Sequence, residues 1–359
     1  MFKKIDTYII KRYLATFSVM LLLFIPIGIM VDVAEKIDKF KENEVPFSEI
    51  FYYYIDFMWY FGNILFPIFL FLAVIWFTSK LANNTEIIAI LSSGISFYRF
   101  LRPYVISASL IAVFAFFAGM FIIPKASEGF NAFSYKYLIK RKDDRKTSNL
   151  FKQINENEFI YISSYNPTRM RGMDFSLEHF ENDSLKFKIM AQSIRWVERD
   201  SLFRLVNYKK RVVLGDEERY YKENILDTIF DFEVQDLAPL NYKAETLSMV
   251  PLNEFIKEEK RSGSVSINQH LLVRHKRYSL PVSAFVLTII AVAVSSFKRR
   301  GGMGVNLAFG ILLGFIFIFF DKIFSVLVAK SNFPPALAAW LPILIFGLLA
   351  YGLLNYAKR

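Results

Sequence analysis

Six long apolar runs, three on each side of a polar segment, constrain this chain more than any other feature. The runs cover residues 14–31, 57–79, 103–124, 278–297, 301–320 and 331–357. A helix needs about 20 apolar residues to cross the hydrocarbon core of a bilayer, and each run is that long or nearly so. Residues 125–276, between the third and fourth runs, are too polar to lie in lipid. We therefore expect a membrane α-helical protein with six transmembrane helices, arranged three and three around an inserted domain.

The composition agrees with a membrane protein. Hydrophobic residues make up 54% of the chain and charged residues 21%, whereas soluble domains average about 25% charged residues. The net charge of +11 gathers at the ends of the apolar runs, which favours contact with a membrane surface rather than with nucleic acid. Cysteine is absent, which excludes disulfides, thiolate metal sites and cysteine nucleophiles.

Basic residues mark one side of the predicted spans. On that side lie Lys3, Lys4, Lys11, Arg12, Lys80, Arg99, Arg102, Lys298, Arg299, Arg300, Lys358 and Arg359. The opposite short loops mix acidic and basic residues. Because cytoplasmic loops carry the excess of Lys and Arg, we expect both termini in the cytoplasm and residues 125–276 outside it. The first run is longer than a usual signal-peptide core and lacks an A-x-A-like cleavage site, so we expect it to be retained.

The polar insert alternates in hydrophobicity with a period of two residues. One example is Leu185, Phe187 and Ile189, separated by lysines, and another is Phe230, Phe232 and Val234, separated by acids. Short alternating segments with turn residues between them are typical of an all-β sandwich or roll. Residues 252–260 instead have a helical pattern.

The chain carries few signals of an enzyme. It contains no phosphate-binding G-x-x-x-x-G-K-[ST] loop, no H-E-x-x-H and no G-x-S-x-G, so we predict no catalytic residue, metal site or cofactor. The apolar runs hold no Asp, Glu, Lys or Arg in their interiors, which argues against an ion-coupled carrier. Sites lined by backbone groups leave that alternative open.

The segment between the second and third runs predicts a short amphipathic helix. Asn84 or Thr85 can cap it, Glu86 suits its positive first turn, and Gly94 is placed to end it. Its apolar stripe consists of Ile87, Ile88 and Leu91. Such a helix can lie on the lipid surface or dock in a groove of another protein, and the pattern leaves both interpretations open.

Residues 86–96, Glu-Ile-Ile-Ala-Ile-Leu-Ser-Ser-Gly-Ile-Ser, resemble the cytoplasmic coupling helix of the LptF/LptG lipopolysaccharide-export permeases. Residues 32–40 resemble the family's segment at the outer end of span one, and residues 335–342 resemble part of its last span. The three-plus-three layout with a large insert is also similar, so the resemblance covers essentially the whole chain.

The resemblance implies a fold and a set of partners. It makes the insert a periplasmic β-jellyroll, giving domains 1–124 with a coupling helix at about 84–94, 125–276 with flanking helices, and 277–359. It implies a bacterial inner-membrane protein paired with a paralogous permease and driven by an LptB-type ATPase dimer. LptC-type and LptA-type proteins would form the periplasmic bridge that receives lipopolysaccharide.

The resemblance also assigns residues. Glu86 matches the acidic position of the coupling helix that faces a basic site on the ATPase. The candidate coupling residues are Glu86, Ile87, Ile90, Leu91 and Gly94. Lys36 and Lys41 match basic positions that meet lipid A phosphates, and Lys39 matches less cleanly. The alternative for these lysines is a solvated outer loop with local pairs such as Glu35–Lys39.

The function implied is that of a permease subunit, not itself an enzyme, in an ATP-driven lipopolysaccharide exporter. Two alternatives come from other classes: a membrane-anchored scaffold or sensor with a periplasmic β domain, and an ion-coupled lipid carrier.

Overall fold

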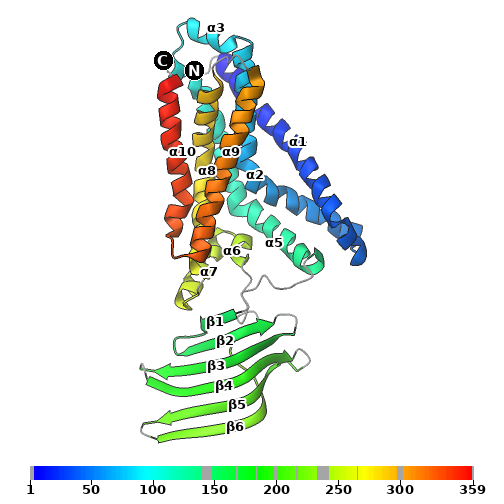
Figure 1. The fold of residues 1–359 in the computed structure, drawn as a ribbon, viewed down its shortest axis with the longest axis vertical. Coiled ribbons are helices and arrows are strands. Elements are labelled where there is room, and N and C mark those ends of the chain that lie inside the picture. The colour runs from blue at the N-terminus through cyan, green and yellow to red at the C-terminus, as the bar shows by residue number, and fades with distance from the viewer. Residues whose placement is uncertain are drawn as a thin grey trace. The chain divides into compact units, whose positions relative to one another are not determined.

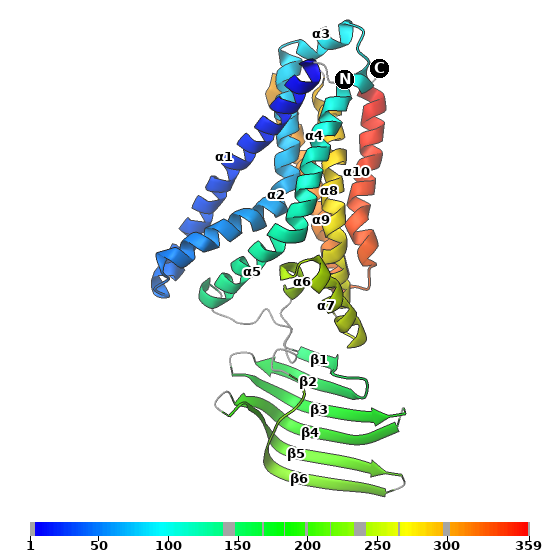
Figure 2. The same ribbon diagram turned by 180° about the vertical axis from the view of Figure 1, so that it is seen from behind.

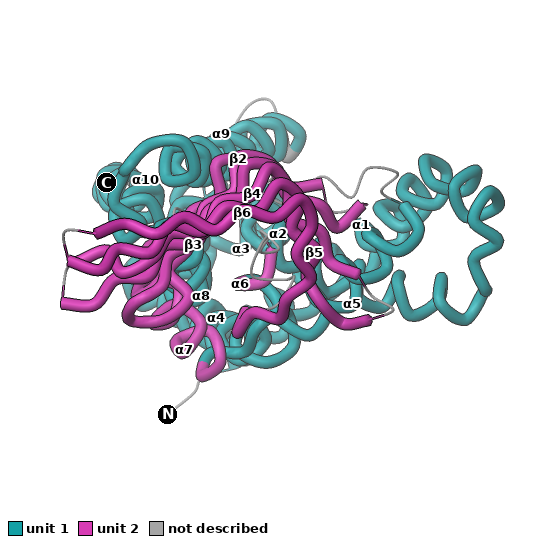
Figure 3. The backbone as a smooth tube through the Cα atoms, turned by 90° about the horizontal axis from the view of Figure 1, so that it is seen from below, with its two compact units in different colours: residues 1–138, 245–249, 268–359 teal, residues 139–244, 250–267 magenta. Residues whose placement is uncertain are grey.

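A computed structural model describes residues 4–138, 148–166, 169–182, 184–197, 200–215, 217–232, 242–264, 266–296 and 302–357. The chain divides into two compact units, coloured separately in Figure 3. A helical unit comprises Met1–Leu138, Glu245–Met249 and Asn268–Arg359, and a β unit comprises Ile139–Ala244 and Val250–Ile267.

The helical unit is a bundle of long helices (Figure 1). Its elements are α1 (Lys4–Glu42), α2 (Phe47–Asn83), α3 (Glu86–Ser92), α4 (Phe97–Phe117), the π-helix η1 (Ala118–Ile122), α5 (Ile123–Phe133), the π-helix η2 (Ser134–Leu138), α6 (Lys243–Thr246, which begins in the β unit), α8 (Ile267–Ser295), α9 (Gly302–Lys330) and α10 (Pro335–Ala357). Within the described residues, six helices are long and apolar enough to cross a membrane. Three of them precede the strands in the chain and three follow.

The helices run well beyond the apolar runs of the sequence. The third candidate span, for example, continues without a break from Phe97 to Leu138, because η1 and η2 prolong the helix. The fifth, Gly304–Lys330, likewise continues past the apolar run and takes in Asp321 and Lys322. Ionisable residues therefore do fall within a candidate span, which the apolar runs alone did not indicate.

The core of the helical unit lies between α1, α2, α4, α8 and α9. Its fully buried side chains include Tyr13, Phe71, Tyr104 and Ile290. Tyr13 of α1 and Thr288 of α8 share a hydrogen bond of 2.7 Å between their hydroxyls. Such a bond satisfies two polar groups inside an apolar core, where an unpaired hydroxyl would be costly.

The two ends of the helical unit carry different connections. The start of α1, the helix α3 and the end of α10 lie at one end, which we call the α3 end (Figures 1 and 2). The turns between α1 and α2 and between α9 and α10 lie at the opposite end, which we call the far end.

The β unit is built on one antiparallel sheet whose six described strands follow one another in chain order. They are β1 (Ser148–Gln153), β2 (Glu158–Asn166), β3 (Arg171–Glu181), β4 (Ser184–Val197), β5 (Leu202–Leu214) and β6 (Glu217–Thr228). The helix α7 (Met249–Arg261) covers the predicted helical pattern. Alternate residues such as Ile162, Phe175 and Leu205 form the buried face. The predicted β character of the insert is confirmed.

The prediction of a strand at residues 230–234 is wrong for its described part. β6 ends at Thr228, and Phe230 and Phe232 lie in an irregular segment. Their rings stack 4.9 Å apart, and both contact Phe203 of the sheet core. Two aromatic residues two apart thus pack against the sheet from a connecting segment, a pattern that mimics a strand in sequence. Glu233 and Val234 lie outside the described residues.

Candidate functional site

The predicted amphipathic helix is present as α3 at the α3 end of the helical unit. The sequence predicted the C-terminal end of α3 correctly but not the cap at its N-terminal end. Thr85 occupies the N-cap position, but its φ of 61° is left-handed and its hydroxyl donates to the carbonyl of Asn84, so it does not cap the helix as expected. Gly94, with φ 85°, follows the helix and donates its N–H to the carbonyl of Leu91, as expected of a helix-ending glycine.

One side of α3 packs on its own protein. Ile87 is buried, and Ile90 and Leu91 are partly buried against the same helical core. Ile88 was expected in this stripe but is 54% exposed. The buried face is centred on Ile87, with Ile90 (i+3) and Leu91 (i+4) on either side of it, and Ile88, turned about 100° from Ile87, falls at its edge. Ile88, Ala89 and Ser92 form the exposed side.

Glu86 is held at the start of this helix by two donors. The hydroxyl of Tyr8 in α1 donates to Oε2 at 3.1 Å, and Nδ2 of Asn84 donates to Oε1 at 3.3 Å. Both bonds are to neutral groups, and no described cation lies within ion-pair distance of this carboxylate. Within the described residues, the partly exposed carboxylate of Glu86 thus has hydrogen-bond donors but no cationic partner.

A second cluster lies at the far end of α1, around Asp32. This aspartate is buried, and its Oδ2 accepts hydrogen bonds of 3.2 Å from both Tyr53 and Tyr54 of α2. Lys36, one turn along α1, forms an ion pair with Oδ1 and donates to the Tyr53 hydroxyl at 2.8 Å. The structure thus places Lys36 in an internal network.

Lys39 and Lys41 differ from Lys36. Both side chains are exposed, and neither forms an ion pair with another described residue. Lys41 lines a groove of about 580 Å³ between the far ends of α1 and α2. The other lining side chains are almost all apolar, among them Ile37, Phe47 and Phe51. The alternative pair Glu35–Lys39 is not formed.

Sequence reasoning missed Asp32 as the centre of the cluster. The i, i+4 spacing of Asp32 and Lys36 was visible, but the two tyrosines come from α2 and only the fold brings them together. The structure buries Tyr53 and turns the hydroxyls of both tyrosines toward Asp32.

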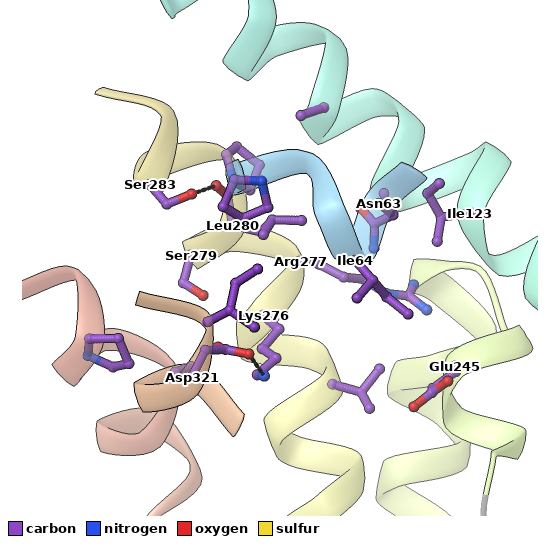
Figure 4. A pocket seen from close by; sticks show the side chains of 18 of the residues that line it. Asn63, Ile64, Ile123, Glu245, Lys276, Arg277, Ser279, Leu280, Ser283 and Asp321 are labelled. Carbon is purple, nitrogen blue, oxygen red and sulfur yellow. Dashed lines mark hydrogen bonds and ion pairs between the residues drawn. The ribbon is translucent and has the colours of Figure 1, made fainter. Parts of the chain in front are cut away.

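A third polar site lies inside the bundle, in a pocket of about 240 Å³ lined by helices α2, α4, α5, α8, α9 and α10 (Figure 4). Lys276 of α8 forms an ion pair of 2.7 Å with Asp321 of α9. Arg277 is buried and donates to the carbonyl of Leu247. Glu245 faces the same pocket, and the protein around it raises the pKa of its carboxyl by limiting hydration.

Within the described residues, six helices long and apolar enough to cross a membrane and a separate antiparallel sheet fit a multi-pass membrane protein with a β domain. Residues 7–356 match the family described as "Lipopolysaccharide export system permease LptF/LptG". The chain therefore belongs to the LptF/LptG family of lipopolysaccharide export permeases, as its resemblance predicted.

Two curated relatives carry more specific names. Over 111 residues the chain is 32% identical to the lipopolysaccharide export system permease protein LptG of Escherichia coli strain K12. It has the same identity to the protein of that name from E. coli O6:H1 strain CFT073. The match covers 31% of this chain and spans about a third (31%) of the length of each relative.

Proposed function

We propose that this chain is one permease subunit of an ATP-driven exporter that extracts lipopolysaccharide from the bacterial inner membrane. Its partners would be a paralogous permease, an LptB-type ATPase dimer on the cytoplasmic side, and LptC-type and LptA-type proteins that form a periplasmic bridge. The observation that carries this proposal is α3, a short helix fixed to the bundle on one side and exposed on the other, with a charged carboxylate at its start.

The α3 end would face the cytoplasm. Lys80, Arg99 and Arg102 accompany α3 there, and basic residues concentrate on cytoplasmic segments. The β unit would then be periplasmic, and we extend its antiparallel sheet to the jellyroll that the family resemblance implies. Labelling of single cysteines placed at Asn182 and at Tyr356 should report opposite sides of the membrane. Labelling from the same side would contradict this orientation.

Coupling to the ATPase would use the exposed side of α3. A basic groove on the ATPase would receive Glu86, while Ile88 supplies apolar contact area. Ile87, Ile90 and Leu91 would join the helix to the bundle, so that a push on α3 moves the helices beneath it. This division of roles follows from their burial.

Lipid binding would use the far end of α1. Lipid A carries phosphates and acyl chains, and Lys41 beside an apolar groove offers a cation and a hydrocarbon-lined surface together. Lys39 adds a second exposed cation. Lys36 would join them only after a phosphate replaces Asp32 as its partner, because its charge is already balanced.

The test is co-purification of the ATPase with the permease pair in detergent, followed by ATP hydrolysis with and without lipopolysaccharide. Truncating one partner of a charged contact buried in an interface costs about 2–5 kcal/mol. Glu86→Ala should therefore reduce ATPase retention strongly, while Glu258→Ala, at an exposed acid of α7 in the β unit, should not. Full retention and lipid-stimulated turnover by Glu86→Lys would contradict docking through α3.

A second candidate function, ion-coupled lipid transport, is favoured by one observation. The Lys276–Asp321 pair lies within candidate spans, and ionisable residues at such depth often serve ion pathways. The two functions separate in proteoliposomes that lack the ATPase. Lipid transfer driven there by a pH gradient would support the carrier and contradict the exporter.

A further inference from the structure

The first turn of α1 is joined to the first turn of α4 by a partly buried ion pair. Nη1 of Arg99 lies 2.6 Å from Oδ1 of Asp6, and Nη2 lies 2.7 Å from Oδ2. Asp6 is only 3% exposed. Two parallel N–H···O bonds from one guanidinium to one carboxylate fix the relative orientation of the groups as well as their distance.

This pair is not explained by the stability of either helix alone. Asp6 suits the first turn of α1, where the helix dipole is positive. Arg99 lies in the first turn of α4, just after the capping Ser96, where a cation is disfavoured. The carboxylate of Asp6 offsets that disadvantage, so Arg99 is placed for contact between the two helices.

The Asp6–Arg99 pair also lies close to α3, at the α3 end of the helical unit. The chain leaves α3 at Ser92 and enters α4 at Phe97, so Arg99 follows α3 closely. Tyr8, in the same turn of α1 as Asp6, donates to Glu86 at the start of α3. The first turns of α1 are therefore tied both to the start of α3 and to the helix that follows it.

Along the remainder of α1, buried side chains are unevenly distributed. Near the α3 end its buried residues, Ile9, Tyr13, Phe17 and Met20, share one face, whereas no residue between Met20 and Asp32 is buried. Pro26 lies in this unburied stretch and lacks the N–H for a helical hydrogen bond. Beyond it lie Lys36, Lys39 and Lys41. The contacts of this stretch are made by partly buried or exposed side chains, such as Phe24, whose ring stacks 5.3 Å from that of Phe69 in α2. A displacement at the start of α1 can thus reach the far end along a helix whose middle is held by no buried side chain.

We propose that Asp6 and Arg99 are positioning residues that pass the movement of α3 to α1, and so to the lysine-bearing far end. This inference rests on the proposed docking of an ATPase at α3. It assigns to the pair a role in transmission that is separate from docking itself, since the pair joins α1 to α4 and its Asp6 side is buried.

The test uses the assembled permease pair with its ATPase and a double neutral variant, Asp6→Asn with Arg99→Gln, which removes both charges of the pair together. We expect ATPase retention and ATP hydrolysis close to those of the wild type, with ATP-dependent lipopolysaccharide transfer reduced about tenfold, within the usual range of coupling between sites. The charge-swapped variant, Asp6→Arg with Arg99→Asp, should recover part of the transfer. The matched control is Arg204→Gln with Asp227→Asn, an equally bidentate pair between β5 and β6 with both contacts at 2.7 Å.

A spin-label measurement reads transmission directly. The chain has no cysteine, so labels at Glu35→Cys on α1 and Leu348→Cys on α10 are unique, and both positions are exposed. Trapping the ATPase with nucleotide should change the distance between these labels in the wild type and in the Arg204/Asp227 control. The change should be absent in the double neutral variant and present in the charge swap.

The outcomes separate the two proposals. If Glu86→Ala leaves ATPase retention intact, the proposed function of α3 fails. If Glu86→Ala releases the ATPase as expected but the Asp6/Arg99 double neutral variant keeps wild-type transfer and the nucleotide-dependent distance change, only the transmission role is overturned. Loss of ATPase retention in the double neutral variant would also overturn it, because the pair would then serve docking.

Discussion

Two buried aspartates on α1 show how one helix can be held firmly at one end and exchangeably at the other. Asp6 is bound by Arg99, a residue 93 positions away in another helix. Asp32 is bound by Lys36, four positions along the same helix, and by two tyrosine hydroxyls from α2. The first arrangement ties helices together through a rigid bidentate contact, whereas the second holds a cation that can turn to another anion.

The two contacts differ in how readily Arg99 and Lys36 can exchange one anionic partner for another. The guanidinium of Arg99 has a fixed fork geometry that no single water reproduces. The ammonium of Lys36 is a compact charge on a flexible stem. Lys36 can therefore exchange partners by rotation of a single charged group, whereas Arg99 must give up two parallel hydrogen bonds at once.

Arg99→Ala should produce the largest effect on stability. It removes both hydrogen bonds that the Arg99 guanidinium donates to the buried Asp6 carboxylate, together with the positive charge of the pair. Thermal unfolding in detergent should show a clearly lowered midpoint. Arg102→Ala, an exposed arginine of the same helix, should leave the midpoint nearly unchanged. Equal midpoints for the two variants would contradict the firm attachment at the α3 end.

Asp32→Asn should lower the unfolding midpoint less than Arg99→Ala does. It should also increase the capture of lipid. It frees Lys36 to bind phosphate, and each surface cation near anionic lipid contributes about 1 kcal/mol. Photo-crosslinking of lipopolysaccharide from a probe at Lys41 should therefore rise several-fold. Asp38→Asn is the control, since Asp38 is an exposed acid of the same helix. An equal rise in that control would show a general field effect and no specific release of Lys36.

Tyr54→Phe should have the smallest effect of the three. It removes one of the hydrogen bonds to Asp32 while leaving Tyr53 and Lys36 in place, and a single such bond contributes about 0.5–1.5 kcal/mol. A modest fall in the unfolding midpoint should separate it from Tyr52→Phe, whose side chain is 67% exposed. A fall in Tyr54→Phe as large as that of Arg99→Ala would mean that the Asp32 network is as firm as the Asp6 pair.

The spans and the β character of the insert could be predicted because both rest on local periodicity. Hydrophobic length reports spans, and alternation reports strands such as β4, without knowledge of any neighbour. The same locality explains the error at Phe230 and Phe232, since alternation looks alike in a strand and in a segment that lays two rings on a sheet.

The sequence predicted the candidate site less completely than the fold, because several contacts of the site join residues on different helices. The existence of α3 and the turn at Gly94 follow from nearby residues, but the exposure of Ile88 depends on which face meets the bundle. Asp6–Arg99 and Lys276–Asp321 join helices distant in the chain. A charge near the end of an apolar run looks the same in sequence whether it meets water or a partner helix.

The most direct test of the proposed function is ATP-dependent transfer of lipopolysaccharide from proteoliposomes to a soluble LptA-type acceptor. The proteoliposomes would contain this chain, a paralogous permease and the ATPase. We expect transfer that requires ATP and is lost in Glu86→Lys but retained in Glu258→Lys, a matched charge reversal on α7. Transfer that proceeds without ATP, or that Glu86→Lys supports at the wild-type rate, would contradict an exporter driven through α3.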